Sequence, residues 1–124
     1  MDKYQALQGF FSSFGLKAYN EIGMPTGENA PKLPYITYEV QVSDWETRVS
    51  TTFSVWYREA TWANIYRKSE EIRRKLKSMN TVKYDKGCIC ITSGSPMITF
   101  MGDVADDKIK RAVFNIEMCF IDLH

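Results

Sequence analysis

The clearest pattern of hydrophobic and polar positions lies between Thr61 and Ser78. Apolar or small residues recur there at steps of three and four, which places them on one face of an α-helix, while charged residues point away. The apolar face consists of Trp62, Ile65, Ser69, Ile72, Leu76 and Met79. At about 1.5 Å per residue such a helix is ~27 Å long, enough to cover several strands of a sheet. Thr61 is the predicted N-cap, because its hydroxyl can accept a hydrogen bond from an early helical amide.

A second helix is predicted from Asp2, its N-cap, to Phe14. Its packed side comprises Tyr4, Leu7, Phe10, Phe11 and Phe14. Gly15 follows and is predicted to end the helix as a C-cap residue. The stretch from Leu16 to Leu33 is rich in glycine and proline, so we predict a long loop there, of a kind that is often functional.

Alternating apolar and polar positions predict strands in much of the remaining chain. The predicted strands are Tyr35 to Val42, Arg48 to Arg58, Thr81 to Tyr84, Cys88 to Thr92 and Lys110 to Ile121. The first two are separated by a short polar turn at residues 43–46 and are most simply an antiparallel hairpin. The third and fourth flank a turn at residues 85–87, and Gly94, Ser95 and Pro96 are expected to end the fourth.

Two further stretches complete the strand predictions. Residues 97–101 are either another short strand or irregular chain, because they show no clear polar alternation. Lys110 to Ile121 is the longest predicted strand, and its second face becomes apolar toward Ile121. That change is expected of an inner strand that is covered on both sides at this end.

These elements predict an α+β fold. Strands that mostly adjoin their neighbours in sequence give a mainly antiparallel sheet with two helices packed on one face. A chain of 124 residues has the usual size of a single compact domain, here spanning residues 1–124. No apolar stretch approaches the roughly 20 residues that span a bilayer, so no membrane partner is expected. The net charge of +1 gives no strong field toward nucleic acid, which leaves only local charged patches.

Residues suited to catalysis are sparse. The only histidine is His124, so we expect no Ser or Cys nucleophile activated by histidine. Asp103, Asp106 and Asp107 cluster near Gly102, where aspartate typically bonds its own backbone in a turn. Their spacing does not match a calcium loop, and the sequence contains no glycine-rich phosphate loop. We therefore expect a protein that is not an enzyme and uses no cofactor or metal.

The sequence contains three cysteines, Cys88, Cys90 and Cys119, and an odd number cannot all pair with one another. No secretion signal precedes the first predicted helix, so we expect a reducing cytosol. Cys88 and Cys90 are one residue apart in a predicted strand, so their side chains point the same way. This arrangement fits a paired thiol site or two small buried groups. Metal sites more often use spacings of two to four residues.

Two groups of side chains are candidates for contact with a partner. Arg74 and Lys75 belong to a basic helix end, where positive charge complements the helix dipole or meets an anionic partner. Tyr35, Trp45, Trp56 and Tyr57 gather around the predicted hairpin, and alternation cannot bury all of them on one face. Among them, Tyr35, Trp45 and Trp56 are the candidates for subunit contacts. Ordinary packing and protein contact both remain open for them, while base stacking would need interleaved basic residues that the hairpin largely lacks.

Several short segments, taken in their order and spacing, carry a family resemblance over nearly the whole chain. They are Tyr4-Gln5-Ala6-Leu7, Phe14-Gly15-Leu16, Ala18-Tyr19, Leu33-Pro34-Tyr35-Ile36-Thr37-Tyr38, Trp56-Tyr57-Arg58, Trp62-Ala63, Ile65, Gly94-Ser95-Pro96, Asp106-Asp107, Ile109-Lys110-Arg111 and Asn115-Ile116-Glu117. In this arrangement the chain resembles the small tail terminator, or tail completion, proteins of siphophages and prophages. None of the segments is a catalytic signature.

The resemblance implies a structural role. Such proteins form a hexameric ring on the head-proximal end of the tail tube, stop tube polymerisation and present a docking surface to the filled head. The implied partners are other copies of the chain, the tail tube protein and a head completion or connector protein. DNA would pass through the lumen without sequence recognition. The implied location is the host cytoplasm during assembly and then the virion tail.

A ring of identical subunits uses two different patches on each subunit. The candidate patches are the loop at residues 16–33, the aromatic hairpin and the basic helix end. Two alternatives stay open: another head–tail connector or neck protein, and a small nucleic-acid-binding module that would use the basic helix.

Overall fold

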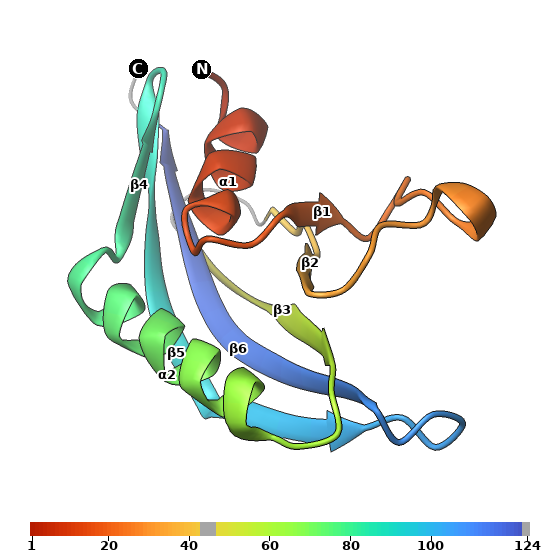
Figure 1. Cartoon of the computed structure of the whole chain (residues 1–124). Coiled ribbons are helices and arrows are strands. Elements are labelled where there is room, and N and C mark those ends of the chain that lie inside the picture. The colour runs from red at the N-terminus through yellow and green to blue at the C-terminus, as the bar shows by residue number, and fades with distance from the viewer. Residues whose placement is uncertain (43–46, 123–124) are drawn as a thin grey trace.

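The computed structural model describes residues 1–42 and 47–122, so the predicted turn at residues 43–46 and the candidate Trp45 lie outside the described residues. One curved sheet carries both helices on the same face (Figure 1). The elements in chain order are α1 (Lys3–Ser12), β1 (Ala18–Asn20), the 3₁₀ helix η1 (Gly27–Asn29), β2 (Tyr35–Tyr38), β3 (Arg48–Arg58), α2 (Ala63–Ser78), β4 (Thr81–Tyr84), β5 (Gly87–Gly102) and β6 (Ile109–Asp122). The strand order is β1-β2-β3-β6-β5-β4, and every pair except β1–β2 is antiparallel. The predicted α+β fold with two helices on one face is confirmed.

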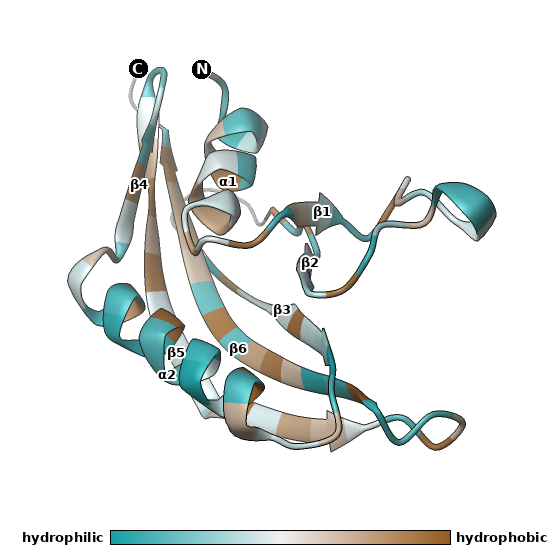
Figure 2. Cartoon of the chain, in the orientation of Figure 1, coloured by the Kyte–Doolittle hydropathy of each residue, from teal (hydrophilic) through white to brown (hydrophobic). Residues whose placement is uncertain are grey.

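The hydrophobic core lies between the helices and the sheet. Every second residue of β6 from Lys110 to Phe120 is buried on this side, and polar residues alternate with the buried apolar ones in the middle of the strand (Figure 2). Phe53 of β3 stacks on Phe114 of β6, with 4.6 Å between ring centroids. Phe11 of α1 packs against Phe53 at 5.1 Å. Burying one such side chain stabilises the fold by about 1.5–3 kcal/mol, so these rings fix α1 on the sheet.

The start of α1 follows the prediction. The Asp2 carboxylate accepts a hydrogen bond from the Gln5 amide at 2.8 Å, and the Gln5 side chain accepts one from the Asp2 amide at 3.0 Å. This capping box satisfies two amides that otherwise lack helical partners. Gly15 has φ 92°, a left-handed conformation that suits glycine, and it turns the chain just after the helix. Tyr4, expected on the packed side, is instead 55% exposed.

Helix α2 is confirmed with a later start, at Ala63. The predicted cap position is wrong, because Trp62 occupies it, although the Thr61 hydroxyl does accept a hydrogen bond from the Ala63 amide at 3.4 Å. The Glu59 carboxylate supplies the better acceptor and binds the Ile65 amide at 3.1 Å. The predicted packed residues Ile65, Ser69, Ile72 and Leu76 are buried, whereas Met79 is exposed.

The loop predicted at residues 16–33 is wrong at Ala18–Asn20. These residues form β1, which pairs in parallel with β2. Three residues are too few to show alternation, so their strand character depends on the hydrogen bonds that β2 offers. The predicted hairpin of β2 and β3 is confirmed as antiparallel, and the bounds of β3 match the prediction. Strand β2 ends at Tyr38 rather than Val42.

The predicted stop at Gly94, Ser95 and Pro96 is also wrong. Strand β5 continues to Gly102 through a register shift between Ser93 and Ile98. Such an irregularity accommodates a proline, which has no N–H to donate to the ladder. The two stretches expected at residues 88–92 and 97–101 are therefore parts of one strand. Gly87, expected in the turn, is its first residue.

Strand β6 lies between β3 and β5, which confirms the prediction of an inner strand. The expectation that its far end is covered on both sides is wrong. Cys119 and Ile121 are only half-buried, because both helices pack on the other face. Within the described residues, the second face of the sheet has no helix over it. We call it the open face.

Candidate functional site

Residues from five strands form a group of exposed and half-exposed side chains on the open face, which we call the aromatic surface. It consists of Tyr19, Tyr35, Trp56, Met101 and Arg111. The pairing of the strands creates the aromatic surface. Tyr19 of β1 lies beside Thr37 of β2, which is on the same face as Tyr35. Trp56 of β3 lies between Tyr35 and Arg111 across the sheet. Met101 of β5 is the next neighbour, opposite Arg111.

The members of the aromatic surface contact one another in sequence across the strands. Tyr19 and Tyr35 meet edge to face, with 5.9 Å between ring centroids, and Tyr35 and Trp56 are 6.4 Å apart. The Arg111 guanidinium lies 4.6 Å from the centre of the Trp56 ring, within the range of a cation–π interaction. The surface is therefore continuous from β1 to β6.

Buried hydroxyl groups hold this arrangement in place. Trp56 Nε1 donates a hydrogen bond to Thr37 Oγ1 at 2.9 Å, and Arg111 Nε donates one to Ser54 Oγ at 3.0 Å. Thr37 and Ser54 are both buried, so their positions are fixed by the sheet. Burial, and then the nearby Tyr19, raises the pKa of Tyr35 and keeps its hydroxyl protonated. Side chains ordered in advance lose less entropy when a partner binds.

A groove of about 290 Å³ adjoins the aromatic surface. Its lining is Trp56, Met101, Gly102, Asp103, Val104, Ile109 and Arg111. Val104 at its end is fully exposed. The groove combines apolar walls with one cation and one carboxylate, which suits an apolar side chain of a protein partner flanked by polar groups. Tyr, Trp, Met and Arg are the residue types enriched at protein interfaces, and the aromatic surface contains all of them.

The structure brings together only some of the predicted contact residues. Tyr35 and Trp56 are neighbours, whereas Trp45 lies outside the described residues. Arg74 and Lys75 belong to α2, on the opposite side of the sheet. Lys75 Nζ donates to the Ser13 carbonyl at 3.2 Å, which ties α2 to the end of α1. Lys75 thus has a structural role within the fold.

The basic part of α2 is partly neutralised by its own acidic residues. Arg73 Nε donates to both carboxylate oxygens of Glu70, at 3.0 and 3.1 Å, and Arg74 Nε lies 3.9 Å from the same group. The hydrogen bond from Arg73 lowers the pKa of Glu70. Lys68 pairs with Glu71 at 3.5 Å. These pairs reduce the charge that α2 offers to an anionic partner.

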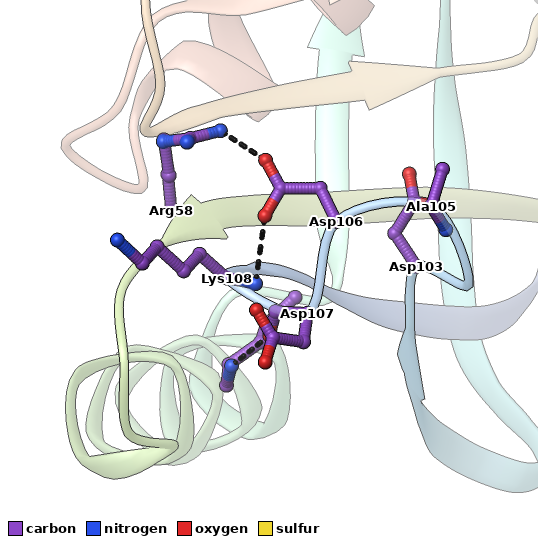
Figure 3. A network of polar contacts seen from close by, with 7 residues as sticks. Arg58, Asp103, Ala105, Asp106, Asp107 and Lys108 are labelled. Carbon is purple, nitrogen blue, oxygen red and sulfur yellow. Dashed lines mark hydrogen bonds and ion pairs between the residues drawn. The ribbon is translucent and has the colours of Figure 1, made fainter.

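The acidic cluster is engaged in local structure at the β5–β6 turn (Figure 3). Asp106 Oδ1 accepts a hydrogen bond from the Lys108 amide at 3.0 Å, and its other oxygen pairs with Arg58. The Lys108 amide first, and Arg58 second, lower the pKa of Asp106. Asp103 Oδ1 accepts from the Ala105 amide at 2.8 Å. Residues 1–42 and 47–122 contain no group of three or more His, Cys, Asp or Glu side chains that could hold a metal ion.

The three cysteines lie half-buried on the open face and form no disulfide. Cys88 and Cys90 share that face as predicted, and Cys119 lies directly opposite Cys90 on β6. Burial, followed by the proximity of Cys90, raises the pKa of Cys88. A protonated thiol is a poor nucleophile and a poor metal ligand, so Cys88 is better suited to packing.

Sequence reasoning missed Tyr19, Met101 and Arg111. Tyr19 fell in the predicted loop and Met101 in a stretch without a clear pattern, so neither had a face assigned. Arg111 was on the polar side of its predicted strand, but its position beside Trp56 depends on the β3–β6 register. Sequence alternation assigns a face to a residue and leaves its neighbours across the sheet undetermined.

No protein-family model matches the chain, and a search of curated proteins finds no match. Among the described residues, none of the helices has the length and apolar character needed to cross a membrane.

Proposed function

We propose that this chain is a structural subunit of a phage tail: a tail terminator that assembles as a hexameric ring on the head-proximal end of the tail tube. The aromatic surface carries the proposal, because it is an ordered, largely apolar region with the residue types of a protein interface. The resemblance of the sequence to tail terminator proteins supports the same role and supplies its details.

In this role the ring ends tube polymerisation and forms the surface on which the head docks. Its partners are further copies of the chain, the tail tube protein and a head completion or connector protein. DNA passes through the lumen without base recognition. Passage without recognition requires only weak contact with DNA. The paired cations of α2 are consistent with weak contact, because Arg73 and Arg74 share the Glu70 carboxylate.

The test combines light scattering after size-exclusion chromatography with negative-stain imaging of the full chain. We expect rings, and we expect Trp45→Ala and Trp56→Ala to weaken ring formation. Tyr66→Ala is the matched control, because Tyr66 is an exposed aromatic residue on α2 and outside the aromatic surface. Rings that form equally well in both tryptophan variants would show that these side chains are not subunit contacts.

Addition of purified tail tubes separates the terminator from other ring-forming neck proteins. A terminator ring binds one end of the tube and prevents the addition of tube subunits. A ring that binds filled heads but leaves tube elongation unchanged would instead identify a connector or neck protein.

A further inference from the structure

The connection between β1 and β2, residues 21–34, projects from the body of the subunit (Figure 1). We call it the projecting segment. Its Ile22 side chain is 87% exposed, next to the exposed carboxylate of Glu21. The base of the segment is nonetheless held in place, because the Glu21 amide donates to the Tyr38 carbonyl at 3.0 Å and the Ile22 amide to Asn20 Oδ1 at 3.0 Å. An apolar side chain is thus presented to solvent from a fixed backbone.

A pocket of about 270 Å³ lies between α2 and the middle of β5, and we call it the edge groove. Its apolar lining is Leu76, Ile91, Met97 and Ile116, and its polar lining is Lys77, Asn80, Thr92 and Ser93. The volume is sufficient for a branched aliphatic side chain together with part of its backbone. Lys77 provides a positive charge beside an apolar floor.

The edge groove lies beside a strand edge that is free within the described residues. Strand β4 pairs with β5 only over Gly87–Cys90, and the last bond on that side runs from the Ile91 amide to the Asn80 carbonyl at 2.7 Å. From Thr92 to Gly102 no described strand pairs with that side of β5. Free backbone groups along such an edge can bind an extended segment of another chain.

We propose that the projecting segment of one subunit docks in the edge groove of the next copy, with Ile22 in the pocket and Glu21 facing Lys77. The inference rests on the proposed ring. The projecting segment lies on the opposite side of the molecule from the end of α2 that borders the edge groove (Figure 1), so a subunit cannot fill its own groove. A contact between two different patches on opposite sides is the heterologous type that closes a ring. The charges of Glu21 and Lys77 are complementary across this contact.

The test is sedimentation velocity on the full chain with variants that keep the wild-type far-UV circular dichroism spectrum. Ile22→Asp removes the apolar contact, and Ser93→Trp fills the groove from an exposed position. Tyr4→Asp is the matched control, because it places the same charge at an exposed aromatic residue of α1, outside the projecting segment, the edge groove and the aromatic surface. We expect both test variants to need at least a tenfold higher protein concentration to assemble than the wild type, while the control assembles at the wild-type concentration.

Mixing the two defective variants gives a second readout. An Ile22→Asp subunit keeps an intact groove and a Ser93→Trp subunit keeps an intact projecting segment, so an equimolar mixture should form heterodimers and no rings. Rings that form normally from Ile22→Asp would overturn the docking and leave the proposed function intact. If the wild-type chain forms open chains or dimers, and Ile22→Asp abolishes them, the result would support the docking and contradict the ring. A wild-type chain that stays monomeric at every concentration would contradict the docking itself.

Discussion

At the scale of single residues, Tyr84 connects the β4–β5 hairpin to the end of β6. Its hydroxyl lies 2.5 Å from Asp122 Oδ1 and 3.3 Å from the Ile121 carbonyl oxygen. Burial first, and the Asp122 carboxylate second, raise the pKa of Tyr84 well above its ordinary value of 10.0. The folded state therefore favours the protonated phenol, and the stabilisation it provides is complete below the pKa of the unfolded chain.

This shift predicts a loss of stability in alkali. As the pH rises above about 10, the unfolded chain releases the Tyr84 proton while the folded protein retains it, so the free energy of unfolding falls. Tyr35, Tyr38 and Tyr57 have pKa values shifted in the same direction and add to the effect. Urea denaturation on both sides of this pH measures it. Tyr84→Phe should show a shallower decline than the wild type, and equal declines would argue against a raised pKa of the Tyr84 phenol.

At the scale of elements, the same hairpin depends on the absence of a side chain at Gly87. A Cβ atom there would lie 2.4 Å from the Ile121 carbonyl oxygen and 2.6 Å from the Tyr84 ring. Both distances are shorter than real Cβ contacts allow, and the carbonyl belongs to backbone in the adjacent strand β6. The first residue of β5 therefore has to be glycine for β4 to pack as it does.

We predict that Gly87→Ala lowers the free energy of unfolding by about 1–3 kcal/mol, the usual cost of forcing extra volume into packed structure. Gly102→Ala is the control at the other end of β5, because a Cβ atom there would have nothing within 4 Å. Chemical denaturation of both variants measures the difference. If the two substitutions cost the same, the close approach of β6 and Tyr84 to Gly87 is wrong.

At the scale of the whole molecule, the charge distribution disfavours nucleic acid as the main partner. The net charge is +1, and the most basic element, α2, holds Arg73 and Lys68 in pairs with Glu70 and Glu71. The residues of the aromatic surface lie on the face of the sheet opposite α2, so base stacking on that surface and phosphate contact with α2 would not occur at one site.

We therefore predict only weak binding of a short labelled DNA duplex at physiological salt, with a dissociation constant above ~10 µM in fluorescence anisotropy. Glu70→Gln serves as the comparison, because it releases Arg73 and Arg74 and should strengthen binding at low salt. Submicromolar affinity of the wild type with a steep salt dependence would favour the nucleic-acid-binding alternative instead.

The sequence alone determined the elements whose pattern is local. Helix α2, helix α1 with its Asp2 cap, and strand β3 follow from residues a few positions apart, because helical and strand periodicities are properties of a short window. The same patterns determined the fold class, since one apolar face per element requires helices to cover one side of a sheet.

Features that depend on pairing between distant residues follow from the three-dimensional packing of the chain. Strand β1 exists because β2 offers it hydrogen bonds, and β5 passes Pro96 because β6 continues beside it. Trp56 was a candidate from sequence, but its contact with Arg111 follows from the register of β3 and β6. The edge groove likewise follows from β4 ending before β5 does. Periodicity fixes which face a side chain takes, whereas its neighbours on that face are fixed by long-range packing.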